Sequence, residues 1–369
     1  MPAGVGGSNI RVPEFRISGV TEPMPAYVKR IVIDYAQDGP DMFEITFLNQ
    51  STQDRQKQLF THQSGRFAGK LKEGDEITIH LGFQPGGVEK MIVGEITSTE
   101  AQYHEHHPST FTVRGFDKLH RLSRGRKQRT FLKMKDSDIA KKIAQEMGLQ
   151  AEVDDSGIIR EHVFQNNLSD IDFLYARARF IGFEVDVLDT KLLFKKPQVN
   201  NSSGLVFKWE TDLKRCRFYL STAQQVDEVQ VRGWSPKEKK EIVGKASATD
   251  VLSKMSGSKA GGEVQAGKFG GGKRVSLICN VPLETQAEAD AVAKARLNEL
   301  SMNFITGEAE VEGNPKLKTG AVIELQEVGA KYEGKYYVVN ATHTVRVGDG
   351  MGTGYTTRIS FKRMGVKEV

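Results

Sequence analysis

One phrase occurs twice in this chain, and it limits the possible folds more than any other feature of the sequence. The segment that starts at Lys70 reads KLKEGDEITIHL, and the segment that starts at Lys316 reads KLKTGAVIEL. When the two are aligned, Gly74 matches Gly320, and the apolar residues of the following strand coincide. A shift of one residue would turn every side chain of a strand to the opposite face. The alignment therefore predicts two copies of one β-structure.

The likeness extends to the strands on both sides of this phrase. The stretch from Lys90 reads KMIVGEITST and aligns with KYYVVNATHT from Lys335. The last strands end at Phe116 and Phe361, each 26 residues beyond its lysine, and upstream VKRIVIDY corresponds to LKRCRFYL. Because short β patterns have low specificity, a chance likeness between amphipathic strands is the alternative explanation.

Alternation of apolar and polar residues indicates strands in both regions. In the first region Ile31, Ile33 and Tyr35 share one face, and turns rich in Gly, Pro and Asp separate such runs. Several short strands within about 100 residues are typical of a small barrel. We expect a mainly β chain with an α+β insert, in which two homologous small antiparallel β-barrels accompany a helical α+β domain.

Three helices are predicted from apolar spacing and from capping residues. The first lies in DSDIAKKIAQEMG, where Asp136 or Ser137 is the expected cap. The second lies in SDIDFLYARARFIG and has a capping box formed by Ser169 and Asp172. The third begins after Thr285, which also starts a capping box.

These patterns divide the chain into four parts. We expect the first β-barrel in residues 1–119, the α+β insert in 120–204, the split second β-barrel in 205–240 and 305–369, and a glycine-rich excursion with a helix in 241–304. The excursion is inserted into the second barrel. Its Gly, Ser and Lys residues are a poor basis for a packed core, so we expect this stretch to be flexible.

Charge and composition exclude few classes of protein. The net charge of +5 is small for 369 residues and argues only weakly for nucleic-acid binding. No apolar run is long enough for a membrane-spanning helix, and the first residues do not resemble an export signal. Cys216 and Cys279 are too few for a tetrahedral zinc site. We therefore expect a protein made in the cytoplasm, and export as part of a larger particle remains open.

Two motifs resemble chemical sites. GKFGGGKR places Gly267, Gly272 and Lys273 at the spacing of a phosphate-binding loop, but Arg274 stands where such a loop has Ser or Thr. The sequence before it does not read as a strand, and the sequence after it reads as a strand rather than a helix, so a glycine-rich loop is the favoured interpretation.

The stretch YHEHH contains a possible metal-binding pair. Strand alternation would place His104 and His106 on one face, with Glu105 facing away. Zinc sites usually need three or four protein ligands, so the favoured interpretation is an exposed hairpin tip. We predict no catalytic, metal-binding or cofactor-binding residues and no cofactor.

The densest positive stretch lies directly after the first barrel. Its charges come from five residues: Arg121, Arg124, Arg126, Lys127 and Arg129. The stretch is either a solvated linker or a contact for a partner or for the wall of a channel. A positive ring could admit DNA or an unfolded cargo chain through salt-sensitive attraction. It contains no aromatic residues for stacking, so a dedicated nucleic-acid platform is not expected.

Two similar barrels in one chain have a consequence for assembly. Most soluble oligomers are closed and symmetric, and three copies of this chain would present six similar barrels around one axis. Such a ring could bind a six-fold partner on one face and a three-fold partner on the other. This role requires no catalytic residues.

Three segments resemble a known family. EVQVRGWSPKEKKEIVGKA, VFQNNLSDIDFLYARARFIGFEV and EVEGNPKLKTGAVIEL are similar to the phage late control D family. That group includes the baseplate hubs of contractile-tailed phages and the N-terminal part of the valine-glycine repeat spike proteins of type VI secretion. The resemblance runs from about Val28 to Phe361 and rests on the order of strands and helices.

The resemblance implies a homotrimeric hub with pseudo-six-fold symmetry. Its implied partners are a hexameric inner tube protein, a trimeric spike and other baseplate components of a phage tail or contractile injection particle. The sequence ends at Val369 without the needle of the spike proteins. We therefore expect a separate spike chain and a structural protein that is not an enzyme. The alternatives are a tail-tip cell-wall hydrolase and a glycan-binding β module.

Overall fold

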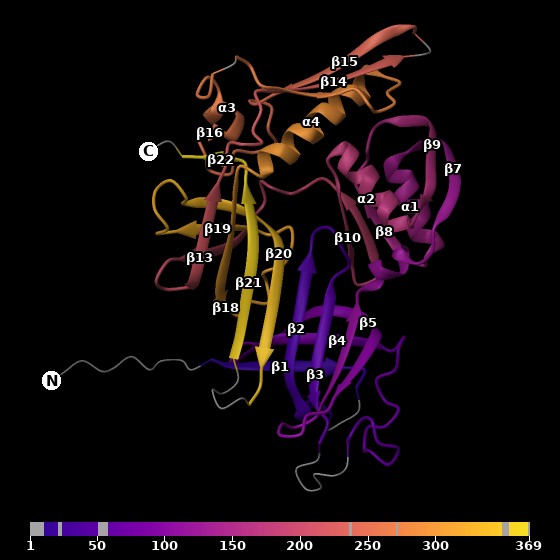
Figure 1. Cartoon of the computed structure of the whole chain (residues 1–369), viewed down its shortest axis with the longest axis vertical. Coiled ribbons are helices and arrows are strands. Elements are labelled where there is room, and N and C mark those ends of the chain that lie inside the picture. Colours follow the sequence, from indigo (N-terminus) through magenta and orange to yellow (C-terminus); the bar gives the residue numbers. More distant parts are fainter. Residues whose placement is uncertain are drawn as a thin grey trace, which may run out of the picture.

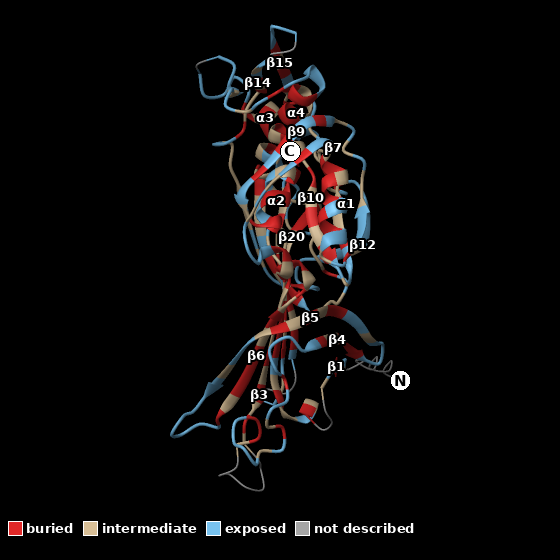
Figure 2. Ribbon diagram, turned by 90° about the vertical axis from the view of Figure 1, so that its right-hand side faces the viewer, coloured by how far each residue is buried: buried red, intermediate tan, exposed pale blue. Residues whose placement is uncertain are grey.

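The computed structural model describes residues 11–20, 24–50, 58–235, 238–270, 272–348 and 354–367. Most of its elements are strands, which confirms the predicted mainly β fold. Two β units lie side by side, a helical insert packs on one flank, and a long helix lies above the second unit, beneath a hairpin at the top (Figure 1). Buried residues follow the strands, and exposed residues gather at the loops at both ends of the molecule (Figure 2). Residues 1–10, where an export signal would stand, lie outside the described residues.

The first β unit has six strands and one short 3-10 helix, η1 (Met24–Tyr27), which directly precedes the second strand. The strands are β1 (Val12–Ser18), β2 (Val28–Ala36), β3 (Met42–Leu48), β4 (Glu76–Gln84), β5 (Gly87–Gln102) and β6 (Thr110–Phe116). Their order in the sheet is β1-β4-β5-β6-β3-β2. Alternate side chains from these strands form one face of the largest core, because successive residues of a strand point to opposite faces.

The second β unit repeats this arrangement. Its strands are β12 (Ser202–Lys208), β13 (Leu213–Leu220), β18 (Ile305–Glu312), β19 (Val322–Gln326), β20 (Gly334–Arg346) and β21 (Gly354–Arg363). They are ordered β12-β19-β20-β21-β18-β13, so each strand takes the place of its counterpart in the first unit. Pairing of β2 with β20 joins the two units into one 12-stranded sheet. One difference is that β1 runs antiparallel to β4, whereas β12 runs parallel to β19.

Backbone contacts fix which residues correspond. The amide of Gly74 donates to the carbonyl of Ile96 at 2.8 Å, and the amide of Gly320 donates to the carbonyl of Val338 at 2.9 Å. A β-bulge follows each acceptor, between Ile96 and Ser98 in β5 and between Val338 and Asn340 in β20. The aligned glycines of the repeated phrase therefore occupy the same place in both units.

Two details of the predicted alignment are wrong. Thr78 pairs with Val93, and its counterpart Glu324 pairs with Lys335, so Lys335 corresponds to Val93 and not to Lys90. Likewise, the counterpart of Phe116 is the residue after Phe361, namely Lys362. In the first unit, β4 and β5 continue past a bulge at the step from Ile79 to His80, and the second unit lacks this bulge. Distances counted along the chain do not reveal the difference.

One buried pair shows how the two units have diverged. In the first unit Phe43 on β3 lies opposite Gly115 on β6. At the same place in the second unit, Gly307 on β18 lies opposite Phe361 on β21. A Cβ atom on Gly115 would come within 2.5 Å of the Phe43 ring, and one on Gly307 within 2.5 Å of the Phe361 ring. Each unit therefore has room for one aromatic ring at this layer, and the ring has changed strands.

The insert between the units has its own core. It comprises η2 (Lys118–Ser123), β7 (Lys127–Lys135), α1 (Asp136–Glu146), β8 (Gln150–Val153), β9 (Ile159–Leu168), α2 (Asp170–Ile181), β10 (Glu184–Leu188) and β11 (Lys191–Lys195). Ser169 caps α2 through the amide of Asp172, and Gly182 ends it with φ of 73°. The predicted cap of α1 is wrong. Lys135 holds that position without a side-chain bond, and Asp136 binds arginines instead.

A second insertion separates β13 from β18. It contains β14 (Glu228–Ser235), β15 (Lys240–Ser247), β16 (Lys259–Ala260), α3 (Gly261–Gln265), β17 (Val275–Ile278) and α4 (Gln286–Met302). The expectation that residues up to 240 belong to the second barrel needs correction. β14 forms a separate sheet with β15 and β17, and Val229 and Val231 pack in a core with α4.

The glycine-rich excursion is more closely packed than its composition predicted. Met255 is buried, and β16 pairs with β22 (Gly365–Val366) at the end of the chain. Gly261 and Gly262 are buried as well, and a Cβ atom on Gly262 would lie 2.2 Å from the carbonyl oxygen of Val226. The glycines therefore allow close backbone contact, which offsets the scarcity of large apolar side chains.

His343 on β20 is a fully buried histidine whose hydrogen bonds fix its tautomer. Nε2 lies 2.8 Å from the carbonyl oxygen of Leu317, so it carries the proton, and Nδ1 accepts from the Tyr355 hydroxyl at 2.8 Å. Burial lowers the pKa of His343 from 6.5 to about 4. In the unfolded chain this histidine therefore binds a proton near pH 6.5, whereas in the folded chain it binds one only near pH 4.

We expect His343 to make the protein less stable as the pH falls from 6.5 to 4. Its contribution is fully present above pH 6.5 and is lost through this window. Urea unfolding of the wild type and of His343→Gln, measured from pH 7.5 to 4.5, should show a difference in midpoint that shrinks with falling pH. His106→Gln, an exposed control, should follow the wild type. A difference that is the same at every pH would contradict this expectation.

Candidate functional site

A polar region lies where β10 of the insert meets the two β units. Val185 and Val187 belong to the core of the insert. The alternate residues of the strand, Glu184 and Asp186, face the β units, because successive side chains point to opposite sides. β10 therefore separates an apolar core from a layer of carboxylates.

Glu184 connects all three parts of the molecule. One carboxylate oxygen accepts from Gln37, in the turn after β2, and the other accepts from the hydroxyl of Tyr337 on β20, both at 2.6 Å. Burial raises the pKa of Glu184 above its usual value. The insert is thus held to both β units through one half-buried side chain.

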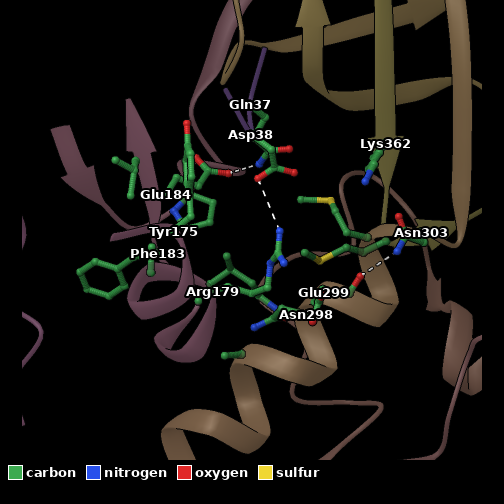
Figure 3. A pocket seen from close by; sticks show the side chains of 18 residues that line it. Gln37, Asp38, Tyr175, Arg179, Phe183, Glu184, Asn298, Glu299, Asn303 and Lys362 are labelled. Atoms are coloured by element: carbon green, nitrogen blue, oxygen red, sulfur yellow. Dashed lines mark hydrogen bonds and ion pairs between the residues drawn. The ribbon is translucent and has the colours of Figure 1, made fainter. Parts of the chain in front are cut away.

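A cavity of about 220 Å³ opens beside Glu184, between α2 and α4 (Figure 3). Its wall combines charged residues with small and sulfur-containing ones. Asp38 and Arg179 approach each other across it at 3.8 Å, and Lys362 projects toward it from β21 (Figure 3). Both members of this ion pair are largely exposed, so they contribute little to stability.

Three aspartates gather close to Glu184. Asp41 precedes β3, Asp117 follows β6, and Asp186 lies on β10; one carboxylate oxygen of each lies within 4.8 Å of the others. Burial raises the pKa of all three, to about 8 for Asp117 and about 6 for Asp186. Lys318 is the nearby cation, and its ammonium group lies 3.4 Å from the carbonyl oxygen of Met91.

The sequence patterns did not predict this cluster. The three aspartates come from two loops and a strand that are far apart in the chain. In the sequence Asp41 reads only as part of a turn, and no spacing rule joins it to Asp117 or Asp186. The one available signal was position along the chain. Asp41 directly precedes a strongly alternating strand, and Asp117 directly follows one.

The predicted basic stretch is largely neutralised within the chain. Arg121 binds Glu95, and this hydrogen bond holds the pKa of Glu95 at about 2. Lys127 and Arg129 both bind the buried Asp170, at 2.6 and 2.7 Å.

The other two residues of the stretch differ. Arg126 donates to the carbonyl oxygen of Asn167 at 3.0 Å. Neither it nor Arg124 forms an ion pair with any described carboxylate. Their side chains are therefore the part of the stretch that can meet a partner.

The histidines and the glycine loop take the positions that the favoured interpretations predicted. His104 and His106 are exposed in the loop between β5 and β6, and the rings of His104 and His107 are 6.2 Å apart. The glycine loop leads into the strand β17, and Lys273 forms an ion pair with Glu228. A phosphate-binding loop would lead into a helix.

Solved structures share this fold over nearly the whole chain. The 43 kDa tail protein of prophage MuSo2 from Shewanella oneidensis is 14% identical, with a TM-score of 0.69, over 96% of this chain and 98% of that one. The tail protein from Neisseria meningitidis MC58 is 14% identical, with a TM-score of 0.66, over 96% of each chain. The Escherichia coli c3393 protein, a component of the type VI secretion system, is 12% identical, with a TM-score of 0.61, over 95% of this chain and 77% of that one. This chain therefore has the fold of phage tail and type VI secretion proteins, as the resemblance in its sequence implied.

The sequence itself also matches a defined family. Residues 19–346 match the family model described as the Alg8 N-terminal domain, and the chain belongs to this family. No curated protein sequence matches the chain. Within the described part of the structure, every helix is too short or too polar to cross a bilayer.

Proposed function

We propose that this chain is the structural hub subunit of a tail-like baseplate. In this role it forms a homotrimer that binds a hexameric inner tube on one face and a separate trimeric spike on the other, among other baseplate components. The observation that carries the proposal is the repeated strand order of the two β units in one continuous sheet. Three such chains would present six similar units, which matches a three-fold partner to a six-fold one.

The junction between the two units suggests how the chains would join. Within one chain, β2 pairs with the part of β20 that extends beyond β19, from Asn340 to Arg346. The counterpart of β2 is β13, which is the last strand of the sheet. The edge of β20 that pairs with β2 has its counterpart in Ser98 to Gln102 of β5. This stretch lies beyond Glu95, the last residue of β5 that pairs with β4.

We infer that β13 of one chain pairs with this free edge of β5 in the next chain. The two strands lie on opposite sides of the molecule (Figure 1), as a head-to-tail ring requires. An unpaired strand edge is a ready template for such pairing. The interface between chains would then copy the interface within the chain.

A cysteine cross-link tests both the trimer and its register. Asp34 pairs with Thr342 within the chain, and the corresponding residues across the proposed interface are Tyr219 and Glu100. In a Cys279→Ser background, the double variant Tyr219→Cys with Glu100→Cys should oxidise to a covalent trimer on a non-reducing gel. Light scattering of the wild type should give three copies. The single variant Tyr219→Cys is the control and should remain uncross-linked.

A wild type that stays monomeric at micromolar concentration would count against the hub. Trimers without the cross-link would reject the register alone.

The basic residues Arg124 and Arg126 belong to this proposal as partner or channel contacts, and Arg126→Glu should weaken tube binding without changing the trimer.

A further inference from the structure

The aspartate cluster at the three-way junction is an unusual arrangement of like charges. Asp41, Asp117 and Asp186 are largely buried, and their carboxylates lie within 4.8 Å of one another. Bringing like charges together in a poorly solvated place is costly, and buried charges are normally paired or bound to metal ions. Lys318 can offset only one of the three charges. With all three carboxylates ionised, the cluster would therefore keep two negative charges, and burial opposes that state by raising the pKa of each aspartate.

One oxygen of the cluster has no partner. Asp117 is only 3% exposed, and its Oδ1 accepts from the amide of Leu119 at 2.9 Å. Its Oδ2 is buried and has no hydrogen-bond partner among the described residues. The hydroxyl of Tyr175 on α2, which is close enough to sense Asp186 and Asp117, is also buried without a described partner. Unpartnered buried polar groups of this kind are rare in folded proteins, and a bound ion or water is one way in which they are satisfied.

We propose that Asp41, Asp117 and Asp186 bind one hard divalent cation of the calcium or magnesium class. Carboxylate oxygens are the preferred ligands of these ions. Oxygens on opposite sides of Ca²⁺ are about 4.8 Å apart, and those around Mg²⁺ are closer, so the observed spacing fits either ion after small adjustments. The two positive charges of the cation would balance the two carboxylate charges that Lys318 does not offset.

The cation would connect two parts of the fold. Asp41 and Asp117 belong to the first β unit, where the amide of Asp117 donates to the carbonyl oxygen of Asp41 at 2.9 Å. Asp186 belongs to the insert. The ion would therefore fix the insert against the β unit at a point where the structure otherwise places three acids.

Thermal unfolding of the full-length chain tests the site. Protein treated with EDTA and then exchanged into chelator-free buffer is melted with calcium chloride or magnesium chloride. We expect a saturable rise in the midpoint of about 3–5 °C at a hundred times the dissociation constant. The response to the two salts identifies the preferred ion. Isothermal titration should give one ion per chain.

Matched variants separate this site from general salt effects. Asp186→Asn removes one ligand at nearly constant volume and should abolish the response, whereas Asp138→Asn, at an exposed site on α1, should retain it. If Asp186→Asn fails to fold, equilibrium dialysis of the wild type against either ion still decides the question.

The proposal is overturned by a wild type that shows neither a shift nor binding with both salts. It is also overturned by an equal shift in the wild type and Asp186→Asn. If Asp186→Asn melts higher than the wild type and neither responds to cations, the acids are held protonated and the cation site is rejected. None of these outcomes depends on whether the chain forms a hub.

Discussion

Arg160→Met should lower the free energy of unfolding by about 3–5 kcal/mol, because it leaves a buried carboxylate without its partner. Arg160 on β9 is 7% exposed, and its Nη1 lies 2.5 Å from Glu288 at the start of α4. Its Nε also binds Asp136 at 3.3 Å, and its guanidinium lies over the Phe180 ring. This network joins the first insertion to the second.

Asp136 keeps Arg177 as a partner after the substitution, whereas Glu288 loses its only described cation. The capping box of α4 also depends on Glu288, since its other oxygen accepts from the amide of Thr285. Denaturant unfolding followed by circular dichroism measures the loss. Arg296→Met is the control, because it breaks an exposed pair with Glu299 and should change stability by no more than about 0.5 kcal/mol. A loss below about 1 kcal/mol for Arg160→Met would show that the network is dispensable.

Phe43→Ala and Phe361→Ala should each cost about 3–5 kcal/mol, because each removes the single ring that fills the same layer of its unit. Both rings are almost fully buried. Each lies opposite a glycine, at Gly115 or Gly307, so the paired residue has no side chain that could fill the space. Similar losses are expected because each ring fills the same layer of its own unit, although from a different strand.

The same unfolding experiment tests both variants. Phe164→Ala is the matched control, since this ring is 44% exposed on β9 and should contribute less than about 1 kcal/mol. If one of the buried substitutions behaves like the control, the two units do not share a common packing layer. Phe43→Leu should lose less than Phe43→Ala, because it leaves a smaller void.

The sequence predicted the features that depend on local rules. Alternation placed the strands around Ile31 and Ile323, and capping residues placed the helices that begin after Ser169 and Thr285. The match of Gly74 with Gly320 was predicted correctly, but the register of the later strands was not, because the longer β4–β5 hairpin does not show in the residue pattern.

Side chains that act between elements were not predictable either. Asp136 looked like a helix cap, yet tertiary contacts with Arg160 and Arg177 recruit it. β14 alternates like a strand of the second unit, but alternation says nothing about which sheet a strand joins. The cluster of Asp41, Asp117 and Asp186 exists only after three distant segments have docked.

The pairing of β2 with β20 has a consequence for synthesis on the ribosome. Arg30 leaves the exit tunnel about 300 residues before its partner Arg346, a delay on the order of tens of seconds at ordinary translation rates. Throughout that time β2 presents an open hydrogen-bonding edge to neighbouring nascent chains. Polysomes that carry several copies of this message should therefore be prone to premature association through β2, and a chaperone that covers β2 would raise the yield of soluble protein.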